Sequence, residues 1–170
     1  MYKTEIYKID SHGEIYSYFP SNLNENLKYP LVIALCCTTG NPKAEVKTNG
    51  WDKLICKENI IVVAPTYNNY ATYSETSYIK SVIHDAIKRY PIDTGKIYST
   101  GFSNGGALSV AMLSTYPTLL AGISAMGWMI DMNDKTPKNK IPFLLIQGIN
   151  EYTTKTSSGS MTIMDDEKTA

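Results

Sequence analysis

The sequence predicts an α/β domain with a mainly parallel sheet flanked by helices. Two short, continuous apolar runs, Leu31–Leu35 and Ile60–Ala64, are typical of strands that are buried on both faces. Two longer segments, Tyr78–Tyr90 and Asn104–Tyr116, have the spacing or the composition of helices. Strands that alternate with helices along the chain are characteristic of this fold class.

The first half of the chain is expected to form a hairpin, two core strands and a helix. Glu5–Asp10 and Glu14–Phe19 flank a Ser-His-Gly turn, which predicts two paired strands. Leu31–Leu35 and Ile60–Ala64 follow as core strands. Between them, Trp51–Glu58 comes after the turn-forming Asn-Pro and Asn-Gly dipeptides and is predicted to be a short helix.

The second half is expected to continue the alternation of helices and strands. The apolar residues of Tyr78–Tyr90 form one stripe with a period of 3.6 residues, and Pro91 ends this helix. Asn104–Tyr116 is apolar nearly all round, which predicts a deeply buried helix. A strand is expected at Ile97–Thr100, and two further core strands are expected at Ala121–Met126 and Phe143–Gln147.

The composition favours one domain, residues 1–170, and argues against several kinds of partner. Sixteen Lys and Arg residues balance sixteen Asp and Glu residues, which gives no electrostatic basis for binding nucleic acid or an anionic membrane. The longest apolar run, Leu31–Cys37, is far shorter than the ~20 residues of a membrane-spanning helix. The N-terminus lacks the apolar core of a signal peptide, which predicts a cytoplasmic protein, or a secreted one if a leader was removed.

The segment Gly101-Phe102-Ser103-Asn104-Gly105-Gly106 carries the clearest chemical signal. It fits the pattern G-x-S-x-G between a predicted strand and a predicted helix, which indicates a nucleophile elbow with Ser103 on a strained turn. The flanking glycines are needed because side chains there would collide with the neighbouring strand or helix. The backbone N–H of Asn104 can then help to hold an oxyanion. The alternative is a loop in which Ser103 or Asn104 only caps the helix.

Three blocks of sequence resemble the esterase branch of the α/β-hydrolases that includes poly(3-hydroxybutyrate) depolymerases and feruloyl and acetyl-xylan esterases. The blocks are YPLVIALCCTTGNP, YPIDTGKIYSTGFSNGGALS and IPFLLIQGINEY. The resemblance implies hydrolysis of a small-molecule or polymer-borne carboxylic ester by a Ser-His-Asp/Glu triad, without a metal or an organic cofactor. It assigns Ser103 as the nucleophile, the Asn104 N–H as one oxyanion donor and Glu151 as the triad acid.

The resemblance places the second oxyanion donor in the loop after Leu31–Leu35, with the N–H of Thr38 or Cys37 as candidates. Similar proteins have His-Gly where this chain has Cys36-Cys37. We therefore expect Cys37 to adopt backbone angles that glycine adopts freely. The three cysteines of the chain have neither a disulfide nor a zinc spacing, so the Cys36-Cys37 pair is interpreted as small buried apolar residues.

The triad of this fold runs in the order Ser, acid, His, but no histidine follows Glu151. The two histidines, His12 and His84, are predicted in a turn and on the outer side of a helix. We expect an N-terminal portion of an esterase, with the last strand and helix of the fold missing. The alternative is an inactive pseudo-hydrolase or a ligand-binding module. In either case the 170 residues alone are expected to be nearly inactive, because loss of the base costs about 10⁶-fold in kcat.

Several aromatic and apolar residues are candidates for lining an ester-binding pocket. Trp128 and Met129 follow the predicted strand Ala121–Met126, with core packing as the alternative. Tyr70 lies with Tyr67 and Tyr73 in TYNNYATYS, after another core strand, where α/β proteins bind ligands. The alternative for this loop is a solvated surface segment. The sequence leaves the identity of the substrate and the oligomeric state open.

Overall fold

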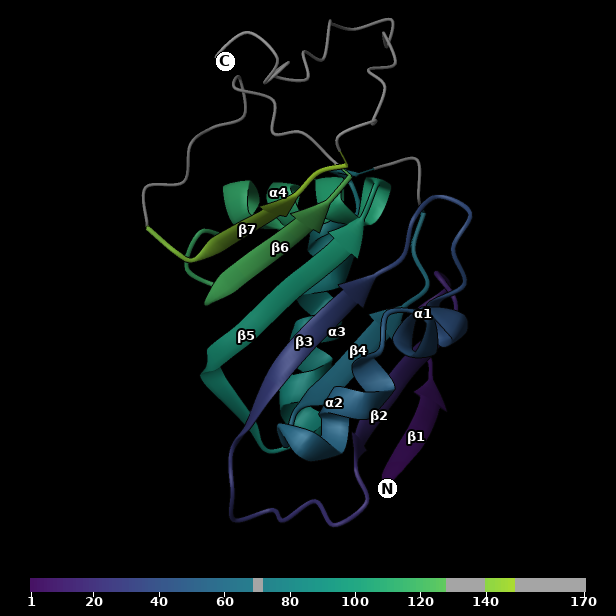
Figure 1. The fold of residues 1–170 in the computed structure, drawn as a ribbon, viewed down its shortest axis with the longest axis vertical. Helices are drawn as coiled ribbons and strands as arrows, with labels where there is room; N and C mark the ends of the chain where they lie inside the picture. Colours follow the sequence, from purple (N-terminus) through teal and green to yellow (C-terminus); the bar gives the residue numbers. More distant parts are fainter. Residues whose placement is uncertain (69–71, 128–139, 149–170) are drawn as a thin grey trace, which may run out of the picture.

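A seven-stranded sheet forms the centre of the molecule (Figure 1). The structure, a computed structural model, describes residues 1–68, 72–127 and 140–148. In chain order the elements are β1 (Tyr2–Tyr7), β2 (Ile15–Pro20), β3 (Tyr29–Leu35), α1 (Pro42–Thr48), α2 (Trp51–Lys57), β4 (Ile61–Pro65), α3 (Thr76–Arg89), β5 (Ile92–Phe102), α4 (Asn104–Thr115), β6 (Gly122–Met126) and β7 (Phe143–Ile146).

The strands lie in the order β1-β2-β4-β3-β5-β6-β7. The pairings from β4 through β7 are parallel, whereas β1 with β2 and β2 with β4 are antiparallel. The mainly parallel α/β sheet predicted from the sequence is therefore confirmed. In a parallel sheet the carboxyl ends of the strands meet at one edge, so the loops after β3, β4 and β5 are neighbours.

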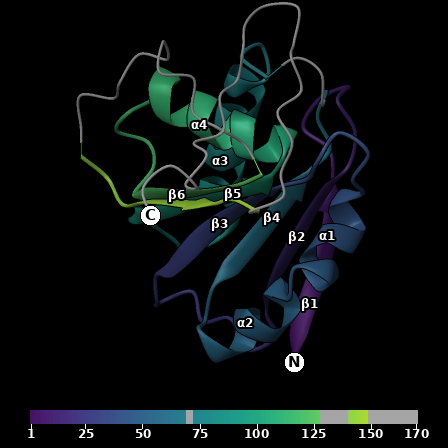
Figure 2. The same cartoon turned by 45° about the horizontal axis from the view of Figure 1, so that its top comes forward.

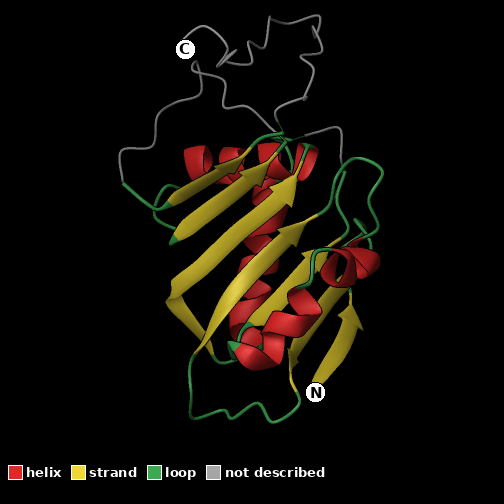
Figure 3. Ribbon diagram, in the orientation of Figure 1, coloured by secondary structure: helices red, strands yellow, loops and turns green. Residues whose placement is uncertain are grey.

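A pair of helices lies against each face of the sheet (Figures 2 and 3). α1 and α2 contact β2, β3 and β4 on one face, and α3 and α4 contact β3 to β6 on the other. Among the described residues, the buried side chains form two apolar clusters, one beneath each pair of helices. None of the described helices has the length and apolar character required to cross a membrane.

The two long helices confirm the predictions made from periodicity and composition. The apolar stripe of α3 is buried, while His84 lies on its exposed side. In α4 every residue from Gly105 to Leu113 is buried, as expected for a helix that is apolar nearly all round. Both helices pack against the same face of the sheet. This packing holds the start of α4 against the ends of β3 and β5.

The helix α1 is missing from the sequence prediction, which treated Asn41-Pro42 only as a turn. Asn41 is the N-cap of this helix, and its side-chain oxygen accepts a hydrogen bond from the Lys43 N–H at 2.9 Å. Pro42 occupies the first turn, where a missing N–H costs nothing. The Asn41-Pro42 dipeptide, which the sequence analysis treated as a turn, is therefore the start of α1.

The strand β7 is present, but the prediction of a core strand at Phe143–Gln147 is wrong about its burial. All four side chains of β7 are between 37% and 56% exposed. In the described part of the chain, β7 pairs with β6 alone and forms the edge of the sheet. Its continuous apolar sequence is typical of a strand covered on both faces, and the described elements do not supply that cover.

The exposed edge at β7 predicts self-association of the 170-residue chain, because apolar edge strands pair readily with other chains. The substitution Leu144→Lys should shift the protein towards monomer in size-exclusion chromatography over a range of concentrations. Leu27→Lys is a matched control, since Leu144 and Leu27 are both 56% exposed and Leu27 lies in a loop away from β7. A wild-type chain that elutes as a monomer at every concentration would contradict this expectation.

Candidate active site

Ser103 lies on a strained turn between β5 and α4. Its φ of 53° and ψ of −118° are unusual for a residue with a side chain. Asn59 is the one other described non-glycine residue with a positive φ. The Ser103 N–H donates a hydrogen bond to the Met126 carbonyl at 2.7 Å, which ties the turn to the end of β6. The predicted strand-to-helix turn at Ser103 is therefore present.

The alternative of a simple helix cap at Ser103 finds no support. Ser103 occupies the N-cap position of α4, but its side chain makes no capping hydrogen bond. The first turn of α4 is held instead by the backbone, since the Ala107 N–H donates to the Ser103 carbonyl at 3.0 Å. The Ser103 hydroxyl is therefore not used to satisfy the end of the helix.

Two glycines permit this turn, as the sequence pattern predicts. A Cβ atom on Gly101 would lie within 3.0 Å of the Gly105 backbone, and one on Gly105 would lie equally close to the Leu35 carbonyl. Real Cβ atoms do not approach a backbone so closely. The start of α4 therefore touches both β5 and β3, and this contact fixes the position of Ser103.

The loop after β3 lies beside the turn at Ser103. Leu35 and Gly101 are register partners in the parallel pair β3–β5, so the residues that follow each of them are neighbours. Cys36 is buried, and Cys37 and Thr38 are partly buried. The Gly40 N–H donates to the Cys37 carbonyl at 2.8 Å and closes the loop into a tight turn.

The expectation that Cys37 adopts glycine-like backbone angles is wrong. Cys37 is not among the described residues with a positive φ. The constraint falls on Gly40 instead, because a Cβ there would meet the Cys36 side chain and the Cys37 backbone at 2.8 to 3.1 Å. The Cys-Cys sequence therefore fits this loop without strain at Cys37.

The loop after β4 contacts both of these segments. The Tyr67 hydroxyl donates a hydrogen bond to the Cys36 carbonyl at 2.5 Å, and the Thr72 hydroxyl donates to Asn104 Oδ1 at 2.9 Å. Burial raises the pKa of Tyr67 far above its ordinary value, so this hydroxyl stays protonated. Tyr67 is 6% exposed, which excludes it as a stacking surface for substrate, whereas Tyr73 is exposed.

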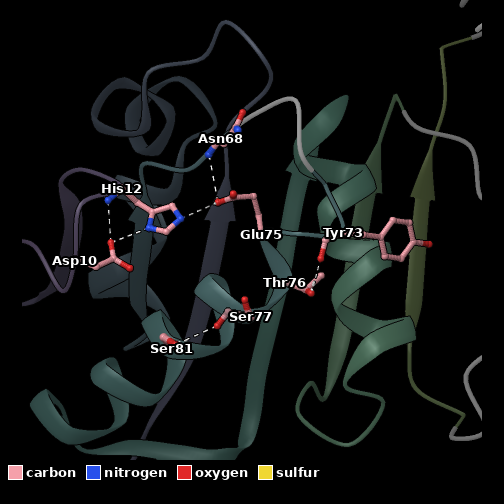
Figure 4. A network of polar contacts seen from close by, with 8 residues as sticks. All are labelled: Asp10, His12, Asn68, Tyr73, Glu75, Thr76, Ser77 and Ser81. Atoms are coloured by element: carbon pink, nitrogen blue, oxygen red, sulfur yellow. Dashed lines mark hydrogen bonds and ion pairs between the residues drawn. The ribbon is translucent and has the colours of Figure 1, made fainter.

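His12 is held in a network of polar contacts at the turn between β1 and β2 (Figure 4). Its Nδ1 lies 2.8 Å from Asp10 Oδ1, and its Nε2 lies 3.6 Å from Glu75 Oε2. Its ring stacks on Tyr78 with 3.8 Å between the centroids. Glu75 is 6% exposed and also accepts a hydrogen bond from the Asn68 N–H at 3.3 Å. The network joins the turn to the start of α3.

The position of His12 does not suit a base for Ser103. The turn that holds His12 precedes β2, whereas Ser103 follows β5, and β4 and β3 lie between these strands. At the usual spacing of neighbouring strands, β2 and β5 are roughly 14 Å apart. His84 lies on the exposed side of α3.

The structure brings together four of the predicted site residues, namely Ser103, Asn104, Cys37 and Thr38. The other four, Glu151, Trp128, Met129 and Tyr70, lie outside the described residues. A cavity of about 840 Å³ opens on the α2 side of the sheet, with Trp51, Tyr98 and Leu144 among its lining residues. Its lining does not include the four site residues, so it is separate from the turn at Ser103.

Comparisons with known proteins agree with the fold and with the esterase resemblance. Residues 65–163 match the phospholipase/carboxylesterase family. The bifunctional acetylxylan esterase/xylanase XynS20E of Neocallimastix patriciarum is 26% identical over 145 residues, covering 81% of this chain and 21% of that protein. The probable acetylxylan esterase A of Aspergillus clavatus is also 26% identical, covering 74% of this chain and 46% of that protein. The chain thus spans less than half the length of these relatives.

A solved structure described as a thermostable esterase has the same fold. It superposes with a TM-score of 0.64 at 21% identity, covering 85% of this chain and 45% of that one. The resemblance to the esterase branch of the α/β-hydrolases, drawn from three blocks of sequence, is confirmed by these matches.

The close approach of Gly105 to the Leu35 carbonyl predicts a large cost for any side chain at this position. Gly105→Ala should lower the free energy of unfolding by at least about 2 kcal/mol, because the overpacked helix must shift away from β3. Urea denaturation measures this change. Gly95→Ala is the control, since its Cβ would meet only Asp93 Oδ1 at 3.3 Å. Equal stability of the two variants would contradict the close packing at the turn.

Proposed function

Because the chain belongs to the phospholipase/carboxylesterase family, we propose that it carries the nucleophile and oxyanion-binding part of a serine carboxylesterase. The observation that supports this most directly is the backbone of Ser103, whose φ of 53° lies on the turn from β5 to α4. Such a strained turn presents a serine hydroxyl at the edge of the sheet. The Ser103 side chain makes no capping hydrogen bond to the helix, so its hydroxyl is not committed to the start of α4.

In the proposed reaction, Ser103 Oγ attacks the carbonyl carbon of the ester, and its proton passes to a general base. The negative charge that develops on the carbonyl oxygen is held by the N–H of Asn104 and by that of Cys37 or Thr38. The C–O bond to the alcohol breaks, and the alcohol leaves with the proton. Water then attacks the acyl-enzyme and releases the carboxylic acid and free Ser103.

The described residues include the proposed nucleophile and the proposed oxyanion donors but no suitably placed base. The chain has two histidines, and the structure places both away from Ser103. Glu151 is proposed as the acid that orients a histidine supplied by a longer polypeptide. This observation also favours the alternative of a binding module that holds an ester or another ligand without turning it over.

We propose acetyl esters of a plant polysaccharide as the substrate class of the complete enzyme. The support comes from two relatives, of which one is a bifunctional acetylxylan esterase/xylanase and the other a probable acetylxylan esterase. Release of acetate from acetylated xylan, compared with release of ferulate from methyl ferulate, tests this class. A clear preference for methyl ferulate would overturn the assignment.

A fluorophosphonate probe tests the nucleophile directly. Ser103 Oγ forms a bond to phosphorus, fluoride leaves, and the hydroxyl proton passes to solvent. Without a base, we expect slow labelling of the 170-residue chain, lost in Ser103→Ala and unchanged in the control Ser81→Ala, an exposed serine on α3. Intact mass spectrometry over several hours measures it.

The outcomes of labelling separate the two candidate functions. Rapid, stoichiometric labelling would contradict the absence of a base. Complete lack of labelling, together with ligand affinity that survives Ser103→Ala, would favour the binding module. Sequencing the coding DNA beyond the codon for Ala170 adds a second discriminator: an open frame with a histidine supports the esterase, and a stop codon supports the module.

A further inference from the structure

We propose that the loop after β4 positions both donors of the oxyanion hole, with Tyr67 and Thr72 as its two positioning residues. This inference rests on the proposed function, because the positions of the two donors affect the reaction only if Ser103 is the nucleophile. Two hydrogen bonds carry it, one from Tyr67 to the loop after β3 and one from Thr72 to the start of α4. Neither residue is placed in contact with the substrate.

The first bond fixes one peptide plane of the loop after β3. The Tyr67 hydroxyl donates to the Cys36 carbonyl at 2.5 Å, and both residues are buried. In a trans peptide the C=O and the following N–H point in opposite directions. Holding the Cys36 carbonyl therefore also sets the direction of the Cys37 N–H, one of the two candidate donors.

The next peptide plane of this loop is held in a similar way. The Gly40 N–H donates to the Cys37 carbonyl at 2.8 Å, which sets the direction of the Thr38 N–H. Both candidate donors thus belong to peptides whose carbonyls are already bonded. Tyr67 supplies the side-chain contact, whereas Gly40 belongs to the loop itself.

The second bond acts on the residue after the nucleophile. The Thr72 hydroxyl donates to Asn104 Oδ1 at 2.9 Å, and Asn104 is the first residue of α4. Asn104 Nδ2 is buried and has no hydrogen-bond partner among the described residues, so Thr72 is the polar anchor that the structure shows for this side chain. Since the Asn104 N–H is the proposed donor, Thr72 restrains that donor through its own residue.

The segment that bears Tyr67 is itself anchored. The Thr66 N–H donates to the Glu14 carbonyl at 2.9 Å, and the Asn68 N–H donates to buried Glu75 at 3.3 Å. Glu75 in turn faces His12 in the network of Figure 4. A hydroxyl can position another group only if its own backbone is fixed, and these contacts on either side of Tyr67 meet that requirement.

Tyr67→Phe is the central test, with Tyr18→Phe as a matched control. Tyr18 is 4% exposed and also donates its hydroxyl to a backbone carbonyl, that of Lys43, on the opposite face of the sheet. A complete oxyanion donor is worth 10²–10³ in rate, so misplacing one should slow fluorophosphonate labelling of Ser103 by about tenfold. Tyr67→Phe should lower the maximal labelling rate and leave the probe concentration that gives half of this rate unchanged.

Thr72→Val tests the second contact against Thr76→Val. Thr76 donates its hydroxyl to the Tyr73 carbonyl at 2.8 Å at the start of α3, and not to Asn104. We expect Thr72→Val to slow labelling and Thr76→Val to leave it unchanged. Equal labelling rates for wild type, Tyr67→Phe and Thr72→Val would overturn the inference, even if Ser103 is the nucleophile.

Amide hydrogen exchange tests positioning independently of the chemistry. Tyr67→Phe should speed exchange in a peptide that contains residues 36–40, and Tyr18→Phe should not. If wild-type Ser103 does not label at all, the proposed function fails, and exchange still decides whether Tyr67 orders the loop. Unchanged exchange in Tyr67→Phe would overturn the inference whatever the labelling shows.

Discussion

The contact between the start of α4 and the carboxyl ends of β3 and β5 determines the arrangement of the candidate site. Gly101 and Gly105 bring the helix backbone against the strands so closely that a Cβ atom at either position would collide with backbone atoms. This packing places Ser103 on its strained turn and sets Asn104 at the first position of the helix. It also brings the loop after β3 beside the turn, because Leu35 and Gly101 are register partners. The positions of the proposed nucleophile and of its proposed oxyanion donors therefore follow from one steric constraint.

Structural features that depend on a short stretch of neighbouring residues could be predicted from the sequence. The apolar runs of β3 and β4, the stripe of α3 and the glycine pattern around Ser103 each report their own environment. Features that depend on distant partners could not. The contact of Tyr67 with Cys36 joins two loops 31 residues apart, and no local pattern marks it. The exposure of β7 is similar, because its apolar sequence describes a strand with cover on both faces and says nothing of where that cover lies.

The structure places His12 in a turn and His84 on the exposed side of α3, as the sequence predicts. Histidine is a common catalytic base, yet His12 is held between two carboxylates and against the ring of Tyr78. Burial favours protonation of Asp10, but the hydrogen bonds from the His12 N–H and ring outweigh it, so the pKa of Asp10 lies below its ordinary value. Such a cluster stabilises the turn between β1 and β2 and braces Glu75. Glu75 also accepts a hydrogen bond from the Asn68 N–H, in the loop that bears Tyr67. The cluster around His12 therefore helps to order a loop of the candidate site, although His12 lies far from Ser103.

The buried core has a consequence for biosynthesis. The core residues of both apolar clusters lie between Ile15 and Ala125, so the chain can close its described core as soon as β6 has left the ribosome. A domain generally folds as a unit during synthesis. At that stage the segment that forms the turn at Ser103 has also been synthesised, and the four apolar residues of β7 follow later at the edge of the sheet. A nascent polypeptide of this kind exposes a short apolar strand, which is the type of segment that molecular chaperones bind.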